Sequence, residues 1–539
     1  MLGMTAAASP GPATAPVVVA GGGPAGLAAA AELDLHGVAV IVIEPRTEVS
    51  HRRPRAKTTS IRTMEHLRRW GLAHALRAAA PLPVAWSQRV TFCESLSGRR
   101  ITDFDNAFGL TTGRDDRFAE SGQQVPQPVV EDVLRRHLSG RPGVELHLGH
   151  ALRAIEQDAG GVTATVTGPD GQPERIRTRY LLGCDGAAGI SRDGIGARYA
   201  GRSDPRPNFN VVFRAPGLDT PLGAAVQYWV LPGAGRGQGD TAGLIGRLDL
   251  HGLWWAIMPG IEAADGEARA SQLITGLIGS RAAHEVLASD PWTARMLIAD
   301  SFADRRVFLV GESAHVNPPW GGHGFNTSVG DAVNIAWKVA AVERGWAGPG
   351  LLASYEPERR GVAEQTVASA ESNMRSLAGD LPADAAAIQA AKRAEFHSLG
   401  LVLGYSYADS AVIQPGGDAR GGGADPDVSC YRPAALPGAR LPHAWLPDGS
   451  SLYDHLGTGF ALVGRDGAAA AALAARARRR RIPLRVVEPP AGYPWQEEYL
   501  LVRPDQHIAW RADDPASVDL DVVTGWRSPV NPPITERGC

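Results

Sequence analysis

The sequence predicts an α/β protein with a Rossmann-type nucleotide-binding domain, a mainly β domain and a C-terminal α/β unit. Three observations favour this fold class. A G-x-G-x-x-G motif lies between two apolar runs within residues 17–44, as in strand–helix–strand units that bind dinucleotides. Two further motifs, at 183–189 and 311–326, each follow directly on an apolar run. Residues 224–232 and 252–260 have the period-two pattern that is typical of strands in a sheet.

Bulk composition narrows the classes of protein to consider. A chain of 539 residues is longer than one core supports, so two or three domains are expected. The net charge of −3 indicates neither a nucleic acid nor an acidic membrane as a partner. No apolar run is long enough to span a bilayer, and the first residues lack the features of a signal peptide. The four cysteines lie far apart without a CxxC, which fits a cytoplasmic protein.

The first motif has the residues of a dinucleotide site. Gly21, Gly23 and Gly26 occupy its three glycine positions. Such glycines permit a tight turn, let the backbone approach a pyrophosphate and let the helix pack against the strand. Glu44 ends the next apolar run about twenty residues further on, where a carboxylate accepts hydrogen bonds from ribose hydroxyls. Arg46 is expected either to lie against the adenine or its phosphates, or to be an exposed loop arginine.

Two later motifs favour FAD over NAD as the bound nucleotide. Asp185 and Gly186 follow an apolar run that begins at residue 180, and the stretch from residue 311 follows the apolar run 307–310. Ligands of open α/β sheets bind at the carboxyl ends of the strands, so both motifs are expected at the same crevice as the first. A long cofactor held at three such points suits FAD better than a transiently bound NAD.

Together these segments resemble the FAD-dependent aromatic hydroxylases, single-component flavoprotein monooxygenases built like p-hydroxybenzoate hydroxylase, over nearly the whole chain. Residues 17–44 match the first motif of that family, Asp185–Gly186 its "DG" motif, and residues 311–326 its "GD…P…G-x-G-x-N" motif. Residues 125–138 resemble the segment whose glutamine reaches the flavin ribityl chain, which makes Gln127 a candidate. The resemblance implies FAD as cofactor and NADPH or NADH as a transient co-substrate.

The chain departs from the family pattern at two points. Glu312 stands where the family has the aspartate of "GD", and its longer side chain is still able to hydrogen-bond a ribityl hydroxyl. Ala188 and Gly189 stand where the DG motif usually continues with arginine and serine, whereas Arg192 remains. The second departure affects the predicted binding of NAD(P)H but not the predicted binding of the flavin.

The resemblance is greatest to the larger members, which hydroxylate polycyclic aromatic polyketides and related antibiotic precursors and carry an extra thioredoxin-like domain. Because the C-terminal region has no CxxC, we expect it to be structural or to form the contact of a homodimer. The glycine-rich stretch 415–427 is expected to lead into it. The implied domains are a discontinuous FAD domain (14–90, 125–200 and 290–400), a β substrate domain (91–124 and 201–289) and the thioredoxin-like domain (428–539).

The resemblance also implies a monooxygenase reaction. NAD(P)H reduces FAD, the reduced flavin reacts with O2, and the resulting flavin C4a-hydroperoxide transfers OH to a phenol or quinol ring. The substrate is expected to be a polycyclic aromatic, polyketide-type small molecule, and the net chemistry to be hydroxylation, oxidative rearrangement or ring cleavage. Two alternatives stay open: a catabolic hydroxylase of a simple phenol, and a flavin-binding protein without oxygenase activity.

The stretch 311–326 is interpreted as a backbone cradle for the flavin. Its glycines and prolines shape the chain, and the backbone N–H groups of residues 322–326 are expected to stabilise the negative edge of the ring. A helix is expected to open at Asn326. Pro318 and Gly321 are placed beside the reacting ring, and the cofactor contacts of this stretch are assigned to Glu312, Gly324, Phe325 and Asn326.

The stretch also contains two histidines. His315 is expected to anchor the loop under the flavin. His323 is a candidate general base for the phenol, with a solvent-facing loop residue as the alternative. Their spacing, with prolines between them, fits no common zinc pattern, so no metal is predicted.

Overall fold

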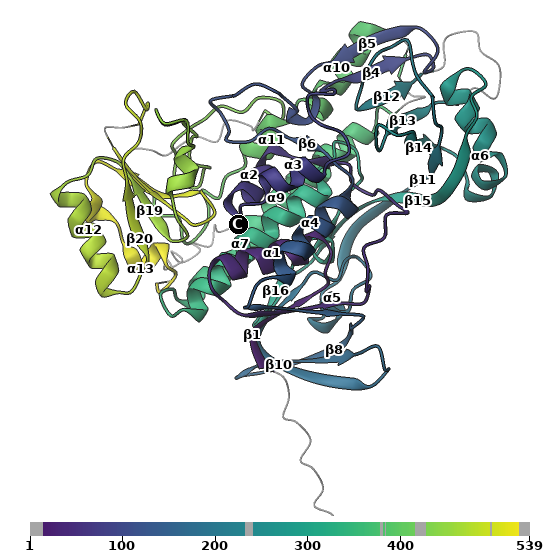
Figure 1. Cartoon of the computed structure of the whole chain (residues 1–539). Helices are drawn as coiled ribbons and strands as arrows, with labels where there is room; N and C mark the ends of the chain where they lie inside the picture. Colours follow the sequence, from purple (N-terminus) through teal and green to yellow (C-terminus); the bar gives the residue numbers. More distant parts are fainter. Residues whose placement is uncertain are drawn as a thin grey trace, which may run out of the picture.

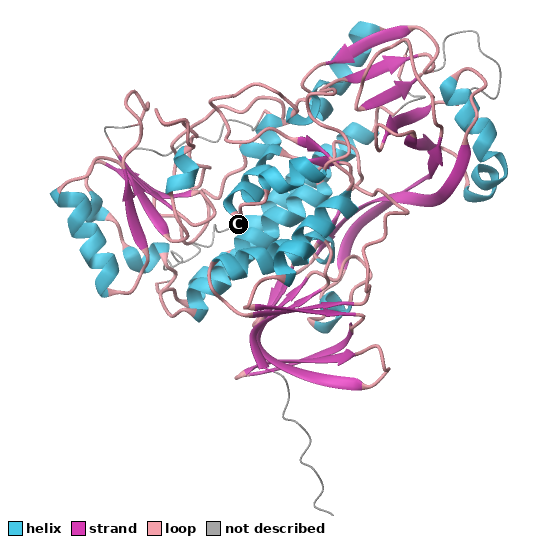
Figure 2. Cartoon of the chain, viewed as in Figure 1, coloured by secondary structure: helices cyan, strands magenta, loops and turns pink. Residues whose placement is uncertain are grey.

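The computed structural model describes residues 14–231, 241–377, 381–382, 384–415, 427–495 and 498–527. Three sheets of four or more strands surround a central group of helices (Figure 1), and helices and strands occur throughout the molecule (Figure 2). The predicted α/β fold class is confirmed. The glycine-rich stretch predicted at 415–427 lies almost wholly outside the described residues.

The first sheet is mostly parallel. Its strand order is β16-β17-β10-β1-β2-β7, and β8 and β9 extend it beside β10. Val17, Val18 and Val19 of β1 are fully buried, because one face packs on helices and the other on the β8–β9 hairpin. The strands are β1 (Thr14–Ala20), β2 (Val40–Glu44), β7 (Val144–Leu148), β8 (Ala151–Asp158), β9 (Gly161–Thr167), β10 (Pro173–Gly183), β16 (Ala303–Asp304) and β17 (Val307–Leu309).

Helix α1 (Pro24–Leu35) follows the first strand directly. Pro24 at its start has a fixed φ that suits the first helical turn, and Gly37, with φ of +67°, follows its end. Helix α1 packs with α7 against the sheet in the main core (Figure 1). The other helices of this region are α2 (Ile61–Arg69), α3 (Ala73–Ala79), α4 (Gln127–Ser139), α5 (Ile190–Gly194), α7 (Gly324–Glu343), α8 (Pro349–Ala353) and α9 (Tyr355–Met374).

The second sheet is mainly antiparallel, in the order β18-β15-β11-β14-β13-β12-β4-β5. Helix α6 (Ala263–Ile278) covers one face, while α10 (Ala385–Phe396) packs on the other near β5. The short helix α11 (Leu399–Leu403) follows α10. The strands are β4 (Val90–Cys93), β5 (Arg100–Phe104), β11 (Tyr199–Arg214), β12 (Gln227–Val230), β13 (Gly243–Arg247), β14 (Leu253–Pro259), β15 (Glu285–Ala299) and β18 (His315–Val316). A two-stranded sheet joins β3 (Thr58–Thr59) to β6 (Gln123–Gln124).

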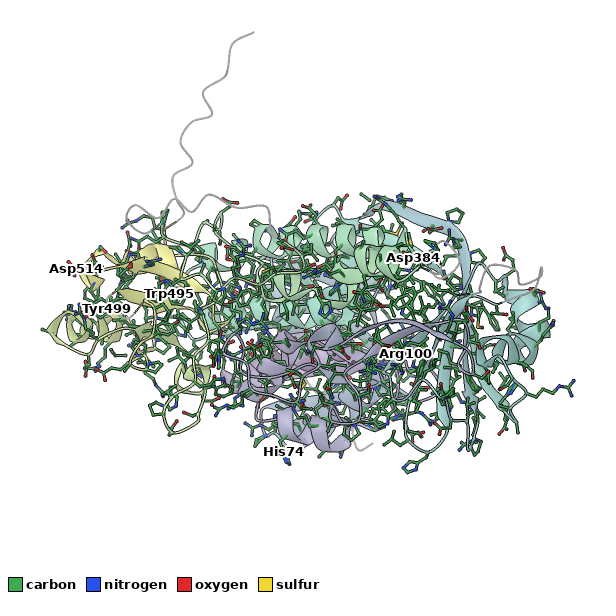
Figure 3. The ribbon with its side chains drawn as sticks, turned by 90° about the horizontal axis from the view of Figure 1, so that it is seen from above. His74, Arg100, Asp384, Trp495, Tyr499 and Asp514 are labelled. Carbon is green, nitrogen blue, oxygen red and sulfur yellow. The ribbon has the colours of Figure 1, made fainter. Side chains whose placement is uncertain are left out.

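The C-terminal unit is a four-stranded sheet with two helices. It packs against the helices of the first region through Trp337, Trp346, Phe460 and Trp510. Trp495, Tyr499 and Asp514 mark this end of the molecule, and Arg100 and Asp384 lie toward the opposite end (Figure 3). The elements are β19 (Phe460–Val463), α12 (Ala468–Arg479), β20 (Leu484–Val487), β21 (Tyr499–Val502), β22 (Ile508–Ala512) and α13 (Leu520–Val523).

Candidate functional site

The glycines of the first motif meet two different spatial needs. Gly21 has a φ of +103°, and a Cβ there would lie 2.3 Å from the carbonyl oxygen of Cys184. A Cβ on Gly26 would lie 1.8 Å from the carbonyl oxygen of Gly21. Both positions therefore require glycine for the turn itself. A Cβ on Gly23 would meet no protein atom within 4 Å, so this residue borders open space at the N-terminus of α1, where a phosphate is favoured.

Glu44, the last residue of β2, closes the same turn. Its Oε2 accepts a 2.7 Å hydrogen bond from the Gly22 N–H, and its Oε1 accepts from the backbone N–H and Nε of Arg46 at 2.8 and 2.7 Å. Burial alone raises the pKa of Glu44, but the hydrogen bonds from Arg46 and Gly22 outweigh it and lower the pKa. Arg46 also lies 3.1 Å from Glu131, which accepts a 2.9 Å hydrogen bond from Nε2 of Gln127. Glu44, Arg46 and Gln127 thus belong to one polar cluster.

The loops after β10 and β17 are tied together beside this turn. The hydroxyl of Ser313 donates to Oδ1 of Asp185 at 2.9 Å and accepts from the Gly186 N–H at 3.0 Å. Oδ2 of Asp185 accepts from the N–H of Ser191 at 2.9 Å. Because β1, β10 and β17 are adjacent parallel strands, the prediction that three distant strand ends meet at one edge of the sheet is confirmed.

These loops line a cavity of about 450 Å³. Of the residues predicted to hold the cofactor, Gly26 is not in its wall because it lies beneath the turn, and Gly324 and Asn326 also lie outside it. The predicted residues that line this cavity are Gly21, Gly23, Glu44, Arg46, Gln127, Asp185, Glu312 and Phe325.

Asn326 fixes the shape of the loop before α7. Its Nδ2 donates to the carbonyl oxygens of Gly322 and Thr58 at 2.7 and 3.0 Å. Its Oδ1 accepts from the Ser60 N–H and the Thr63 hydroxyl, both at 2.8 Å. The amide therefore uses its hydrogen bonds on the protein and joins the loop to the segment around β3.

Helix α7 begins at Gly324, two residues before the predicted start at Asn326. The prediction of its start was wrong because His323 already has helical φ and ψ. The carbonyl oxygen of His323 accepts the N–H of Thr327 at 2.9 Å, which is the first hydrogen bond of the helix. The helix therefore reaches further back into the glycine-rich loop.

The imidazole of His315 anchors the loop, as predicted. Its Nε2 lies 2.7 Å from Oδ2 of Asp331, which also accepts from the Gly311 N–H at 3.2 Å. Oδ1 of Asp331 accepts from Nε of Arg359 at 2.6 Å. All three side chains are buried, so this cluster joins the first part of the loop to α7 and α9.

His323 lies behind the loop. It is 5% exposed, so the alternative of a solvent-facing residue is wrong. A Cβ on Gly321 would lie 2.6 Å from its Nε2, which has no hydrogen-bond partner among the described residues. Burial lowers the pKa of His323 to about 4. The side chain lines neither cavity, and its role as a general base stays a prediction.

A second cavity, of about 820 Å³, lies between this loop and the second sheet. Pro318, Gly321, Gly324 and Phe325, all predicted site residues, line its loop side. The residues common to both cavities are Arg55, Gln127, Glu312 and Phe325. The two cavities therefore adjoin, and an elongated ligand can extend from one into the other.

Large aromatic side chains form the sheet side of the second cavity. The sequence left open which face of the 252–260 strand would line a pocket, and the structure places Trp255 and Ile257 there, with Trp292 of β15 nearby. Trp254 packs on the opposite face, in the core under α6. Trp320 of the loop completes the aromatic wall. The Nε1 atoms of Trp255 and Trp320 have no hydrogen-bond partner among the described residues.

Lys57 also lines the second cavity, although sequence reasoning does not single it out. Its Nζ lies 4.2 Å from the centroid of the Trp255 ring and donates to the carbonyl oxygen of Arg55 at 3.1 Å. Burial lowers the pKa of Lys57 to about 8. A usable signal was the rarity of lysine: the other two, Lys338 and Lys392, each form a buried ion pair.

The two adjoining cavities together offer suitable surroundings for the nucleotide end and the ring end of FAD. The first offers a helix N-terminus for the pyrophosphate and the Glu44 carboxylate for ribose hydroxyls. The open space beside Gly23 is what a close-lying phosphate group requires. Gln127 and Glu312 line the junction of the two cavities, and the glycines Gly321, Gly322 and Gly324 let the backbone of the loop border the second cavity.

Comparison with protein-family models matches residues 14–370 to an FAD binding domain and residues 434–526 to the aromatic-ring hydroxylase C-terminal domain. The chain belongs to the FAD-dependent aromatic-ring hydroxylases. The hydroxylase is accordingly an FAD-dependent aromatic monooxygenase, and the predicted family and the predicted cofactor FAD are confirmed. In the part of the chain that the structure describes, no helix is both long and apolar enough to span a membrane.

Individual relatives of the hydroxylase cover most of its length. It is 30% identical to the 2,4-dichlorophenol 6-monooxygenase of Delftia acidovorans, over 92% of this chain and 94% of that one. It is also 30% identical to the aklavinone 12-hydroxylase RdmE of Streptomyces purpurascens, over 94% and 97% of the two chains. The solved structure of the rebeccamycin biosynthetic enzyme RebC with reduced flavin matches with a TM-score of 0.84 at 30% identity, over 95% and 99% of the chains.

Proposed function

We propose that this hydroxylase transfers an oxygen atom from O2 to a polycyclic aromatic, polyketide-type small molecule, with NADPH or NADH as the electron donor. The observation that carries the proposal is the second cavity of about 820 Å³, which lies beside residues 318–324. Drug-sized ligands occupy pockets of roughly 300–1,000 Å³. Trp255, Trp292 and Trp320 give this cavity broad apolar surfaces that suit a multi-ring substrate.

In this proposal the first cavity holds the nucleotide end of FAD. Backbone N–H groups near Gly23 bind the pyrophosphate, and Gly21 and Gly26 shape the turn that presents them. Glu44 accepts the ribose hydroxyls, while Arg46 holds that carboxylate in place. Asp185 supports the adjoining turn through its hydrogen bonds to the hydroxyl of Ser313 and the N–H of Ser191.

The junction and the loop hold the rest of the cofactor. Gln127 and Glu312 reach the ribityl chain, and the backbone of residues 322–326 donates to the polar edge of the ring. Pro318 and Gly321 border the face at which the substrate lies. Bound and reduced FAD supplies the activation of dioxygen. The protein orients the substrate ring and excludes water from the cavity.

Nicotinamide is proposed to bind only transiently. The chain has a single G-x-G-x-x-G motif, and Ala188 offers no cation where the family has arginine. Arg192 donates to the carbonyl oxygen of Ala187 at 2.9 Å, and its guanidinium lies 3.9 Å from the centroid of the Tyr199 ring. These contacts support a structural role for Arg192 in the turn after β10 and leave NAD(P)H to bind at the open cavity.

A catabolic hydroxylase of a simple phenol is the second candidate function. It is favoured by the relative named 2,4-dichlorophenol 6-monooxygenase, which is as similar in sequence as the aklavinone hydroxylase. The size and aromatic walls of the second cavity favour the polycyclic substrate, because a single ring would leave much of that apolar surface without contacts.

The experiment compares NADPH oxidation by the purified FAD-loaded enzyme with 2-hydroxyanthraquinone, with 2,4-dichlorophenol and without an aromatic compound. We expect the anthraquinone to accelerate oxidation most and to give a product heavier by one oxygen atom in mass spectrometry. Greater stimulation and hydroxylation of dichlorophenol would support the simple-phenol function. NADPH oxidation that no aromatic compound changes would contradict both.

The proposal also covers assembly and location. We place the enzyme in the cytoplasm, where the buried thiols Cys93 and Cys184, whose pKa values are raised by burial, stay reduced. We expect a homodimer with the C-terminal unit as its contact, where Trp526 is 55% exposed. Light scattering tests the dimer: Trp526→Ser should shift the wild-type dimer toward the monomer, and an unchanged mass would contradict this contact.

A further inference from the structure

We propose that Lys57 binds an anionic oxygen of the aromatic substrate, a phenolate or a carboxylate, and thereby selects ionised polycyclic acids for the reaction. This inference deepens the proposed function and rests on it, because it assigns the second cavity to the substrate. It makes Lys57 a specificity-determining residue that contacts the substrate directly.

The place of Lys57 follows from the chain on both sides of it. The carbonyl oxygen of Thr58 accepts a hydrogen bond from Asn326, and the N–H of Val125 donates to the carbonyl oxygen of Lys57 at 2.9 Å. The backbone is thereby fixed between the loop before α7 and the segment around β6. The side chain extends to Trp255, on the sheet side of the same cavity. Lys57 therefore bridges the two walls between which a planar substrate would lie.

The ammonium group of Lys57 has fewer hydrogen-bond acceptors around it than it has donors. An ammonium has three donors, and among the described residues only the carbonyl oxygen of Arg55 accepts a hydrogen bond from it. The Trp255 ring offers its electron-rich face. No carboxylate lies within ion-pair distance of Nζ in the described part of the chain. Lys338 and Lys392, by contrast, pair with Glu358 and Glu395 at 2.7 and 2.6 Å.

The charges around Lys57 leave an excess of positive charge. Arg52, Arg53 and Arg55 lie on the same segment, and Asp290 is the one acid that lines the small adjoining cavity with them. Asp290 is already engaged by Arg53 at 2.9 Å. The second cavity has three acids besides Asp290: Glu395 is paired with Lys392, Glu312 lies at the junction with the first cavity, and Glu262 lies at the start of α6.

An anionic substrate oxygen would supply the missing counter-charge. A cation in a partly buried site is stabilised by an anion at hydrogen-bond distance more than it would be in water. The same contact favours the ionised form of a phenol, and a phenolate ring is richer in electrons for attack by an electrophilic oxygen. Lys57 thus couples recognition of the substrate to its activation.

The test uses the FAD-loaded enzyme and three planar probes of similar size. They are 2-hydroxyanthraquinone, anthraquinone-2-carboxylate and uncharged anthraquinone. Dissociation constants are measured for wild type, Lys57→Met and Lys57→Arg. The pKa of the bound phenol is read from the absorbance of its phenolate, which needs no turnover. Arg52→Met is the matched control, because it removes the same charge from an exposed side chain that does not line the second cavity.

We expect wild type to lower the pKa of the bound phenol below that of the free probe, and Lys57→Met to abolish this shift. Lys57→Met should bind the ionised probe roughly 10- to 100-fold more weakly, with unchanged affinity for anthraquinone and unchanged FAD content. Lys57→Arg should retain most of the affinity, and Arg52→Met should resemble wild type. A loss confined to one of the two acid probes identifies that acid as the preferred substrate group.

Two results would overturn the assignment: equal binding of both acid probes by wild type and Lys57→Met, or no binding of either acid by wild type. The outcome is separate from that of the proposed function. A phenolate shift without any NADPH-dependent oxygenation would refute the proposed function while leaving Lys57 as the anion-binding residue. Oxygenation that proceeds equally in wild type and Lys57→Met, with no shift in the phenol pKa, would refute the assignment of Lys57 and leave the proposed function standing.

Discussion

The backbone N–H of Gly22 donates to Oε2 of Glu44 at 2.7 Å, so the carboxylate at the end of β2 is held against the glycine turn. Its other oxygen accepts two hydrogen bonds from Arg46. This arrangement fixes the carboxylate before any ribose reaches it. The adenosine end of FAD is therefore expected to meet a preorganised acceptor.

Glu44→Gln should weaken FAD binding by about tenfold, because an amide presents a donor where the carboxylate accepts from Gly22 or Arg46. Quenching of FAD fluorescence measures the dissociation constant. Glu48→Gln is the control, since Glu48 lies exposed on the loop after β2. Equal FAD affinity in wild type and Glu44→Gln would contradict the assigned role.

Gly23→Ala and Gly26→Ala should fail in different ways. The Cβ on residue 26 would lie 1.8 Å from a backbone oxygen, so Gly26→Ala should disrupt the turn and lower the melting temperature. The Cβ on residue 23 meets no protein atom, so Gly23→Ala should fold normally and lose FAD. Melting temperature and FAD content of the two purified proteins test this. Full FAD content in Gly23→Ala would show that the phosphates lie elsewhere.

His323 should make stability depend on pH. Burial lowers its folded-state pKa to about 4, below the ordinary value of 6.5. The unfolded chain therefore binds more protons between these values, and stability falls as the pH drops from 6.5 toward 4, by about 3 kcal/mol. His323→Gln, which cannot titrate, should show a flatter decline in the free energy of unfolding measured by urea denaturation at each pH. The same decline in both proteins would contradict this.

The same variant tests the predicted general base. If His323 is the predicted base, His323→Gln should lose one limb of the pH profile of kcat. Steady-state rates across pH with 2-hydroxyanthraquinone measure it. An unchanged profile would contradict that role and would fit the position of His323 outside the walls of both cavities.

Glu358→Gln should destabilise the contact between the C-terminal unit and α9. Glu358 accepts from Nη1 and Nη2 of Arg503 at 2.7 and 2.9 Å and from Nζ of Lys338 at 2.7 Å, with all three side chains fully buried. Removing the anion leaves the buried Lys338 and Arg503 with Asp505, which already pairs with Arg503, as their remaining anion. Losing one partner of such a buried network costs about 3–5 kcal/mol. Urea unfolding measures the loss, with exposed Glu364→Gln on the same helix as control. A loss below about 1 kcal/mol would show that the network contributes little.

The sequence predicted those parts of the site whose chemistry is local. The spacing of Gly21, Gly23 and Gly26 between two apolar runs determines the turn, and the length of one strand–helix–strand unit determines where Glu44 lies. The meeting of three strand ends was also predictable, because parallel strands align their carboxyl ends. The domain limits and the roles of individual site residues remain predictions.

The rest depends on contacts between distant segments. Nothing near Lys57 indicates that Trp255 lies over its ammonium, and nothing near Glu358 indicates Arg503, which is 145 residues further along the chain. The direction of the His323 side chain depends on how tightly the loop turns at Gly321. Periodicity assigned a strand to residues 252–260, but only the packing of α6 on one face determined which aromatic side chains line the cavity.

The proposed coupling of FAD reduction to oxygenation of a polycyclic aromatic compound is best tested by a single-turnover reaction. The FAD-loaded, NADPH-reduced enzyme is mixed with isotopically labelled dioxygen in the presence of 2-hydroxyanthraquinone. We expect a hydroxylated product that carries one labelled oxygen atom. Reoxidation of the flavin with no label in the aromatic compound would contradict it.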